Sequence, residues 1–298
     1  MMERFDSLEE EEAFTVKYLL LGGVPVLALP FEGFTQIGLD IRRACGNAFF
    51  PPRVMICVPS GITEVEERAV IDAGIQAGAR RVYLIEEPVA AAIGAGIDIT
   101  QPDGNLIIDI GGGTTDIAVI SLSGVVESAS IKVAGDQFNE AVVKYMRREH
   151  NLLIGERTAE QMKIQIGCVF PPEEEYSMEV KGRSLLTGLP QETTVTSTEM
   201  MAAFEEPVER IMEAVHAVLE RTPPELVADI STNGIVMTGG GSLVRGFDKL
   251  VVARTGIPTG VADEAILCVA KGTGKSLESV ADMQEGTMNL SRRKQINR

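Results

Sequence analysis

The chain has 298 residues, of which 45% are hydrophobic and 23% are charged, as in a globular protein with one large or two medium domains. Its formal net charge of -16 argues against a nucleic-acid backbone as main partner and against a purely electrostatic attachment to anionic lipid. The cysteines show no C-x-x-C spacing, which favours reduced core thiols and a reducing cytoplasm. They are Cys45, Cys57, Cys168 and Cys268.

The N-terminal region shows no signal-peptide pattern, because the acidic run Glu9 to Glu12 precedes the first apolar stretch, Tyr18 to Leu29. That stretch contains two glycines and a proline and is shorter than the roughly 20 residues of a membrane-spanning helix. The segment from Phe14 to Leu29 instead predicts a strand, a Gly22-Gly23 turn and a second strand. We expect a protein that is soluble or peripheral to a membrane.

The next segment predicts a helix, a strand and a second helix. Apolar residues have helical spacing from Phe34 to Ala48, and a short buried strand is expected from Arg53 to Pro59. Thr63 and Glu66 have the spacing of a capping box. A helix from about Glu64 to Gln76 should follow.

A second buried strand is expected at Val82 to Ile85, before an alanine-rich helix from Val89 to Ala95. Alternating strands and helices predict a parallel strand pair with a crossover connection, covered by helices. Between these elements, Glu86 and Glu87 precede Pro88. Read locally, they are an acidic pair that suits a first helical turn.

Residues 109–116 read Asp-Ile-Gly-Gly-Gly-Thr-Thr-Asp between two apolar runs, which predicts a hairpin with a glycine turn. Such a turn brings backbone N–H groups close to an anion, and threonine hydroxyls can add hydrogen bonds. Two flanking aspartates would repel a bare phosphate but suit one that carries a divalent cation. The segment predicts a nucleotide and metal site; the alternative is a glycine-rich hairpin with solvated acidic ends.

A second glycine turn lies at 234–246, where an apolar run again precedes a glycine triplet. Ser242 is expected to cap a helix that starts at Leu243. Two strand-to-glycine turns in one chain strengthen the prediction of a nucleotide site.

The remaining elements are mostly helical. Asp136 is expected to cap a helix beginning near Gln137, and Pro207 is expected to interrupt a long helix. No metal or catalytic role is expected for the isolated His150 and His216. The predicted segments are helices at 138–148 and 158–167, short strands around a turn at 179–189, a long helix at 198–221 and a disordered tail at 283–298.

These motifs, in this order, resemble the superfamily of actin, sugar-kinase and heat-shock-chaperone ATPases. From Phe31 to about Ser279 the chain is similar to the MreB family of bacterial actins, which organises cell-wall synthesis in rod-shaped cells. The Glu-Arg-Thr-Pro-Pro-Glu-Leu segment at 220–226 separates this family from the chaperones and from FtsA. The other matching segments are 52–66, 86–94, 109–116, 154–160 and 238–242.

The resemblance implies an α/β actin-like ATPase fold, with ribonuclease H-like sheets, helices on both faces and a truncated first domain. Residues 1–30 would be a divergent N-terminal segment. Residues 31–108, with 265–282 returning to them, would be the remnant of the first actin-like domain. Residues 109–264 would be the second domain, with a smaller subdomain at about 150–225.

By the same resemblance, Asp109 would hold Mg²⁺ through water, and Glu87, or alternatively Glu86, would orient the water that attacks the γ-phosphate. Read alone, Glu160 and Lys163 equally suit a solvated i,i+3 pair on a helix. The resemblance assigns the second phosphate loop to Gly111, Gly112, Gly113 and Thr114. It assigns the nucleoside contacts to Glu160, Gln161, Met162 and Lys163 on one side and to Gly239, Gly240, Gly241 and Ser242 on the other.

One family motif has no counterpart in this chain. MreB proteins begin with a hairpin that carries Asp-Leu-Gly-Thr, the first phosphate loop, whereas Met1 to Pro30 has no Asp-x-Gly-Thr. The charge on a transferring phosphoryl group is normally stabilised from several directions. The sequence therefore predicts ATP binding and leaves open whether ATP is hydrolysed. A truncated gene, a divergent paralogue and a fragment that needs another chain are equally compatible with this departure.

The resemblance implies a cytoskeletal protein that binds ATP and Mg²⁺ and forms membrane-associated filaments governing rod cell shape and cell-wall synthesis. The implied partners are other copies or a full-length MreB-like relative, and the cell-wall elongation machinery at the membrane. The implied location is the cytoplasm, peripheral at the inner face of the membrane. The alternative is a non-hydrolysing, truncated subunit that caps or modulates filaments of a full-length relative.

Overall fold

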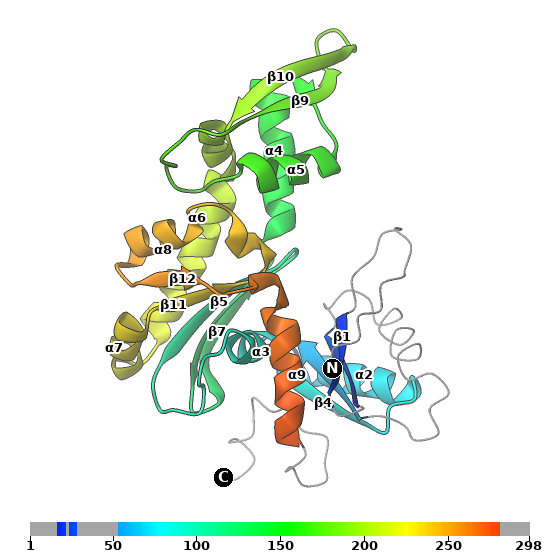
Figure 1. The fold of residues 1–298 in the computed structure, drawn as a ribbon, viewed down its shortest axis with the longest axis vertical. Helices are drawn as coiled ribbons and strands as arrows, with labels where there is room; N and C mark the ends of the chain where they lie inside the picture. Colours follow the sequence, from blue (N-terminus) through cyan, green and yellow to red (C-terminus); the bar gives the residue numbers. More distant parts are fainter. Residues whose placement is uncertain (1–16, 22–23, 29–52, 281–298) are drawn as a thin grey trace.

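The computed structural model describes residues 17–21, 24–28 and 53–280 (Figure 1). The predictions for the Gly22-Gly23 turn, the helix at 34–48, Cys45 and the tail at 283–298 lie outside these residues. Within the described part, Cys57, Cys168 and Cys268 are buried free thiols, as predicted. No helix of this part is long and apolar enough to cross a membrane.

The strands and helices alternate along the chain. The strands are β1 (Lys17–Leu21), β2 (Val24–Ala28), β3 (Arg53–Val58), β4 (Arg81–Glu86), β5 (Asn105–Ile110), β6 (Thr115–Ser121), β7 (Gly124–Ile131), β8 (Leu152–Leu153), β9 (Ser177–Ser184), β10 (Pro190–Thr196), β11 (Ile235–Thr238) and β12 (Thr259–Val261). The helices are α2 (Glu64–Gln76), α3 (Glu87–Gly94), α4 (Gly135–Glu149), α5 (Glu156–Ile166), α6 (Ser197–Arg221), α7 (Pro224–Asn233), α8 (Phe247–Thr255) and α9 (Cys268–Val280), with short 3₁₀ turns η1 (Gly240–Leu243) and η2 (Ala265–Leu267).

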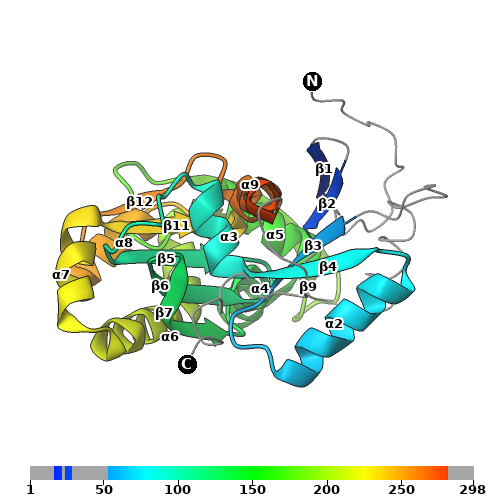
Figure 2. The ribbon, with the colours of Figure 1, turned by 90° about the horizontal axis from the view of Figure 1, so that it is seen from below.

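A five-stranded mixed sheet in the order β12-β11-β5-β6-β7 forms the centre of the molecule. Strand β11 is parallel to β12 and β5, whereas β5, β6 and β7 are antiparallel. Helix α6 packs on one face of the sheet and α3 on the other (Figure 2). Because side chains alternate along a strand, Ile108 joins the α6 side of the core and Ile107 the α3 side. This is the predicted α/β arrangement with helices on both faces.

Strands β3 and β4 form a separate parallel pair, as the alternation of strands and helices predicted. Helix α2 begins at the predicted capping box, in which Thr63 Oγ1 accepts from the backbone N–H of Glu66 at 3.3 Å. The Glu66 carboxylate in turn accepts from the backbone N–H of Thr63 at 2.8 Å. Helix α3 begins at Glu87 rather than at Val89, because Pro88 fits the first helical turn.

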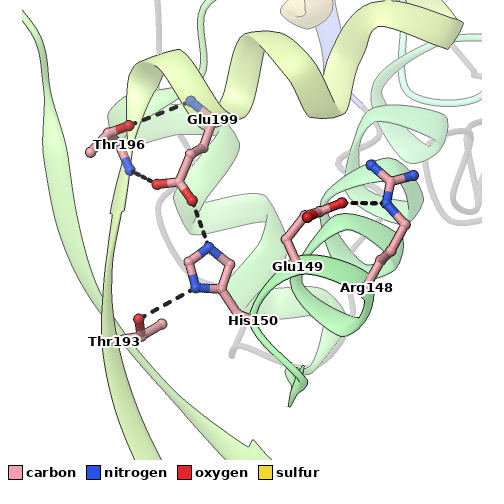
Figure 3. Close-up of polar contacts among 6 residues, drawn as sticks. All are labelled: Arg148, Glu149, His150, Thr193, Thr196 and Glu199. Carbon is pink, nitrogen blue, oxygen red and sulfur yellow. Dashed lines mark hydrogen bonds and ion pairs between the residues drawn. The ribbon is translucent and has the colours of Figure 1, made fainter.

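A smaller lobe at one end of the long axis contains the β9–β10 hairpin, α5 and the end of α4 (Figure 1). Its strands extend beyond the predicted 179–189 segment, to Ser177 on one side and Thr196 on the other. His150, at the end of α4, contacts Thr193 of β10 and Glu199 of α6 (Figure 3). This histidine joins the hairpin to the two helices beneath it.

Three local predictions were wrong. Helix α6 runs through Pro207 without a break, because Phe204, Val208 and Ile211 around it are all buried in the core. Asp136 is not the cap of α4: Ala134 occupies the cap position, and its backbone N–H donates to the side chain of Gln137 at 3.0 Å.

The third concerns the second glycine turn. No helix starts at Leu243; a 3₁₀ turn spans Gly240–Leu243, and the next helix begins at Phe247. The Ser242 hydroxyl donates to the carbonyl oxygen of Gly239 at 2.7 Å, so it closes the turn instead of capping a helix.

Helices α3 and α9 cross at backbone contact distance (Figure 1). A Cβ atom at Gly272 would overlap the carbonyl oxygen of Ala90, and one at Gly94 would overlap that of Cys268. Each helix therefore uses a glycine where the other approaches. This crossing brings the first turn of α9 next to the end of α3.

Candidate functional site

Three carboxylates meet on the α3 face of the central sheet. Strand alternation places Asp109 on the same face as Ile107, and the β5–β6 register pairs Asp109 with Asp116. Glu87 is the first residue of α3, which covers this face. The antiparallel hairpin and the crossover helix thus bring together side chains from β4–α3, β5 and β6.

The first glycine turn connects the two strands of this hairpin. The backbone N–H of Gly111 donates to the carbonyl oxygen of Thr114 at 2.9 Å, which closes the turn. Helix α4 holds it from outside: the N–H groups of Gly135 and Asp136 donate to the carbonyl oxygens of Gly111 and Gly112 at 3.1 and 2.8 Å. The turn is therefore fixed by the chain that follows β7.

The second glycine turn lies beside the first because β11 pairs with β5. Thr238 is in register with Asp109, and its hydroxyl donates to Asp109 Oδ1 at 2.7 Å. Gly239 follows with φ +82°, and a Cβ there would overlap the carbonyl oxygen of Ile110. Only glycine fits this close approach without strain.

Helix α5 supplies a further wall. Lys163 Nζ donates to the carbonyl oxygen of Gly135 at 3.1 Å, which ties α5 to the first turn of α4. Burial lowers the pKa of Lys163, while the neighbouring Glu160 and Asp136 act in the opposite direction. The amine thus sits at the edge of the site, between two carboxylates and the glycine turn.

These elements enclose one cavity of about 700 Å³, which we call the central cavity. It is polar at the glycine turns and apolar where α9 and the two 3₁₀ turns meet. Its lining residues are Glu87, Asp109, Gly111, Gly112, Gly135, Asp136, Glu160, Lys163, Ile164, Gly239, Gly240, Gly241, Leu243, Val244, Ala265, Ile266, Val269 and Ala270. A cavity of this size and mixed lining suits a small-molecule ligand.

The structure brings most of the sequence-derived site residues to this cavity, but some lie beside it. Met162 is fully buried in the core and Ser242 is buried beneath its turn, whereas Gln161 is exposed. Gly113 and Thr114 belong to the first glycine turn without lining the cavity.

The apolar half of the cavity was not foreseen from the sequence. Ile164, Leu243 and Ile266 line it and are 66%, 53% and 61% exposed, so they form an apolar surface that a ligand could cover. Ile164 lies next to Lys163 on a predicted helix, so the helical pattern could have suggested it. Ile266 belongs to a segment distant in sequence from both glycine turns, and no local signal points to it.

Two of the carboxylates have strongly perturbed pKa values. Burial, followed by the charges of Asp109 and Asp116, raises the pKa of Glu87 to about 8. Burial also raises the pKa of Asp109 to about 6, although the hydrogen bond from Thr238 opposes this shift. Buried carboxyl groups with strongly raised pKa values in a cavity are typical of a functional site, because their burial costs stability.

Asp116 adds a buried charge to this group. It is 1% exposed, and its Oδ1 atom has no hydrogen-bond partner. Burial raises the pKa of Asp116, while hydrogen bonds from Ser130 and Thr114 act in the opposite direction. An unpaired buried carboxylate oxygen is costly, so this end of the site suits a cation or an ordered water.

The donor set fits Mg²⁺ bound together with phosphates. Thr238 occupies Oδ1 of Asp109, which leaves Oδ2 for a metal or its water. Within residues 53–280, no group of three or more His, Cys, Asp or Glu side chains could enclose a metal. Mg²⁺ typically takes one or two carboxylates and completes its shell with water and phosphate oxygens. Asp109 is the residue that would hold it.

The family model of the MreB/Mbl protein matches residues 37–285. The cell shape-determining protein MreB of Escherichia coli strain K12 is 49% identical over 250 residues, which cover 83% of this chain and 72% of the relative. The cell shape-determining protein Mbl of Bacillus subtilis strain 168 is 49% identical over 232 residues, covering 78% and 70%.

Solved structures agree with this assignment. MreB5 of Spiroplasma citri bound to ADP has a TM-score of 0.79 and 40% identity, covering 83% of this chain and 74% of that one. A MamK double helical filament, at 22% identity and a TM-score of 0.68, has the same fold over 82% of this chain and 74% of that one. The chain belongs to the MreB/Mbl family of actin-like proteins, with the α/β fold of that family.

Proposed function

We propose that this protein is an actin-type cytoskeletal subunit that binds ATP and Mg²⁺ in the central cavity and assembles into filaments. The observation that carries the proposal is the meeting of the two glycine turns across Asp109, within a family whose solved members include nucleotide-bound structures. MreB5 of Spiroplasma citri has been crystallised with ADP and with AMPPNP, an ATP analogue.

The polar half of the cavity would take the phosphates. Gly111 and Gly112 of the first glycine turn line this region, and Asp109 would hold the metal that the phosphates carry. With Mg²⁺ bound, its charge offsets the repulsion among Glu87, Asp109 and Asp116. The apolar half, around Ile164, Leu243 and Ile266, would cover the nucleoside.

Glu87 is the proposed group for orienting the attacking water. It lines the cavity at the start of α3, on the same sheet face as Asp109. Its raised pKa places it in the range where a side chain exchanges protons near neutral pH. Weak ATP hydrolysis is the activity that the family resemblance implies.

Exposed apolar side chains support self-association. Leu185, Leu186 and Leu189 are 43%, 80% and 65% exposed in the turn of the β9–β10 hairpin, at one end of the long axis (Figure 1). Leu122 and Val126, in the β6–β7 hairpin, are 46% and 41% exposed. Two different apolar surfaces on one subunit allow head-to-tail contacts, which build open filaments.

We further propose that the filaments lie at the inner face of the cell membrane and guide the cell-wall elongation machinery, and so cell shape. The support is the name of the relatives, cell shape-determining proteins at 49% identity.

The first test is ATP binding and phosphate release by purified protein with Mg²⁺. The Asp109→Ala variant should lose Mg²⁺-dependent binding, whereas Asp103→Ala, an exposed aspartate in the loop before β5, should behave as wild type. Equal binding by wild type and Asp109→Ala would refute the proposed site. Phosphate release above that of Glu87→Gln would assign hydrolysis to this chain.

A second candidate function is a nucleotide-binding subunit that does not hydrolyse ATP and caps filaments of a full-length relative. The absence of an Asp-x-Gly-Thr motif from the 298 residues favours it. Sedimentation separates the two: a filament former pellets alone with ATP, whereas a capping subunit stays in the supernatant and shortens filaments of the relative.

A further inference from the structure

An arginine outside the central cavity connects two of its walls. Arg245 follows the second glycine turn, and its Nη1 atom donates to the carbonyl oxygens of Gln165 at 2.7 Å and Ile164 at 3.4 Å. These carbonyls belong to the last turn of α5, the helix that carries Glu160 and Lys163. Arg245 itself does not line the cavity.

This contact uses the chemistry of a helix end. The last carbonyl groups of a helix have no partner within it, and a positive charge there is favourable. The guanidinium of Arg245 also lies 4.6 Å from the centre of the Tyr176 ring, a cation–π distance. One side chain thus binds the end of α5 and the segment that leads into β9.

The surroundings of Arg245 are well fixed. Its carbonyl oxygen accepts from the backbone N–H of Val169 at 3.0 Å, which joins the turn to the chain that leaves α5. Tyr176 and Ser197 exchange hydrogen bonds: the Tyr176 N–H donates to the Ser197 hydroxyl at 3.1 Å, and the Ser197 N–H donates to the Tyr176 carbonyl at 2.8 Å. The backbone that carries the Tyr176 ring is therefore held in place.

The walls that Arg245 joins both line the apolar half of the cavity. Ile164, whose carbonyl Arg245 binds, also lines the cavity on the α5 side. Leu243 and Val244, immediately before Arg245, line it on the side of the second glycine turn. The same last turn of α5 is also tied through Lys163 to Gly135, next to the first glycine turn.

We propose that Arg245 is a positioning residue that sets the separation of the two nucleoside walls, and so the affinity for the nucleoside part of the ligand. The proposal rests on the proposed function, because it assigns the apolar half of the cavity to the nucleoside. The phosphate half is held by backbone hydrogen bonds that join the first glycine turn to α4, without Arg245. Loss of Arg245 should therefore weaken nucleoside contacts and leave phosphate contacts in place.

The experiment compares two ligands, ATP and inorganic tripolyphosphate, both with Mg²⁺, by calorimetric titration of the full chain. Arg245→Ala should weaken ATP binding by about tenfold, the effect of losing a charge-assisted hydrogen bond, and change tripolyphosphate binding less than about twofold. Arg245→Lys keeps the charge but not the fork geometry and should lie between the two. Tyr176→Phe keeps the ring face and should bind ATP as wild type does.

The matched control is Arg254→Ala. Arg254 is also an exposed arginine with an ion-pair partner, Glu209, but it lies on α8 and contacts neither α5 nor the cavity. A cap with a purely structural role would lower the melting temperature without changing the ratio of the two affinities. Hydrogen exchange on the nucleotide-free protein provides a second readout: the amides at 160–167 should exchange faster in Arg245→Ala and not in Arg254→Ala.

Two results would overturn the proposal. One is that wild type binds ATP and Arg245→Ala binds it with the same affinity. This result would refute the role of Arg245 without affecting the proposed function. The other is an equal loss of ATP and tripolyphosphate binding, which would show that Arg245 acts on the whole site. A wild type that binds neither ligand refutes the proposed function instead, and with it any role of Arg245 in binding.

Discussion

The imidazole Nε2 of His150 lies 2.6 Å from Oε1 of Glu199, and this contact joins the end of α4 to the start of α6 (Figure 3). The other carboxylate oxygen of Glu199 accepts from the backbone N–H of Thr196 at 2.8 Å, in the capping box of α6. The Thr193 hydroxyl lies 3.4 Å from Nδ1 of His150. One half-buried histidine thus connects two helices and the β9–β10 hairpin.

His150→Ala should lower the free energy of unfolding by roughly 1–3 kcal/mol, because it leaves a partly buried carboxylate without its partner. Urea denaturation followed by circular dichroism measures the change. His216→Ala is the control, because His216 is exposed on the same helix as Glu199. Equal losses from the two substitutions would contradict a specific role for the His150–Glu199 pair.

Gly112→Ala should weaken ATP binding without affecting the fold. A Cβ at Gly112 meets no atom within 4 Å, so the melting temperature should stay at the wild-type value. The added methyl group would occupy the space where a phosphate approaches the backbone N–H groups, and affinity should fall by about tenfold or more. Gly260→Ala, a glycine with similar open space on β12, should bind ATP normally. ATP binding by Gly112→Ala equal to that of wild type would show that the phosphates do not bind at this turn.

The stability of the protein without nucleotide and Mg²⁺ should fall as the pH rises. Folding raises the pKa of Glu87 from 4.5 to about 8 and that of Asp109 from 3.8 to about 6. Both groups bind protons more tightly in the folded state, so their contribution is present at acidic pH and is lost as the pH passes the folded values.

Urea denaturation across this pH range tests the prediction. Glu87→Gln cannot ionise and should flatten the decline between the two folded pKa values, whereas Glu64→Gln, an exposed residue of α2, should keep the wild-type curve. A wild-type curve that rises with pH would show that the cavity does not raise the pKa of these acids.

Gly272→Ala should destabilise the α3–α9 crossing. Its Cβ would overlap the carbonyl oxygen of Ala90, so the two helices must separate, at a cost of about 1–3 kcal/mol. Thermal unfolding measures this loss, with Gly260→Ala again as the control. Because α9 also lines the cavity at Val269 and Ala270, ATP binding should weaken as well. A variant as stable as wild type would mean that the helices pack less closely than described.

Local patterns predicted the elements whose stability is local. The α2 capping box was correct because Thr63 and Glu66 hydrogen-bond each other across one turn. The β5–β6 hairpin was correct because apolar runs on both sides of a glycine turn leave few alternatives. The predicted break at Pro207 was wrong because the continuity of α6 does not depend on local residues alone. Burial of the residues before and after Pro207 outweighs the backbone hydrogen bond that proline cannot make.

The residues of the candidate site also divide into those that local patterns predicted and those that they did not. The glycine turns and Asp109 are visible in the sequence, because close approach to an anion demands glycine and a metal demands a carboxylate. Arg245 gave no such signal, since its partners, the α5 carbonyls, lie 80 and 81 residues away in sequence.

By itself, then, the sequence determined the α/β class and the family resemblance, and it predicted a phosphate-binding role for residues 109–116, because these depend on short patterns of residue type. Only the tertiary structure decided which of these residues share a cavity. The β11–β5 pairing brings Thr238 to Asp109, and the α3–α9 crossing brings Gly272 against Ala90, while Glu87 and Ala270 line the same cavity. Such contacts depend on how whole elements pack, which no short segment encodes.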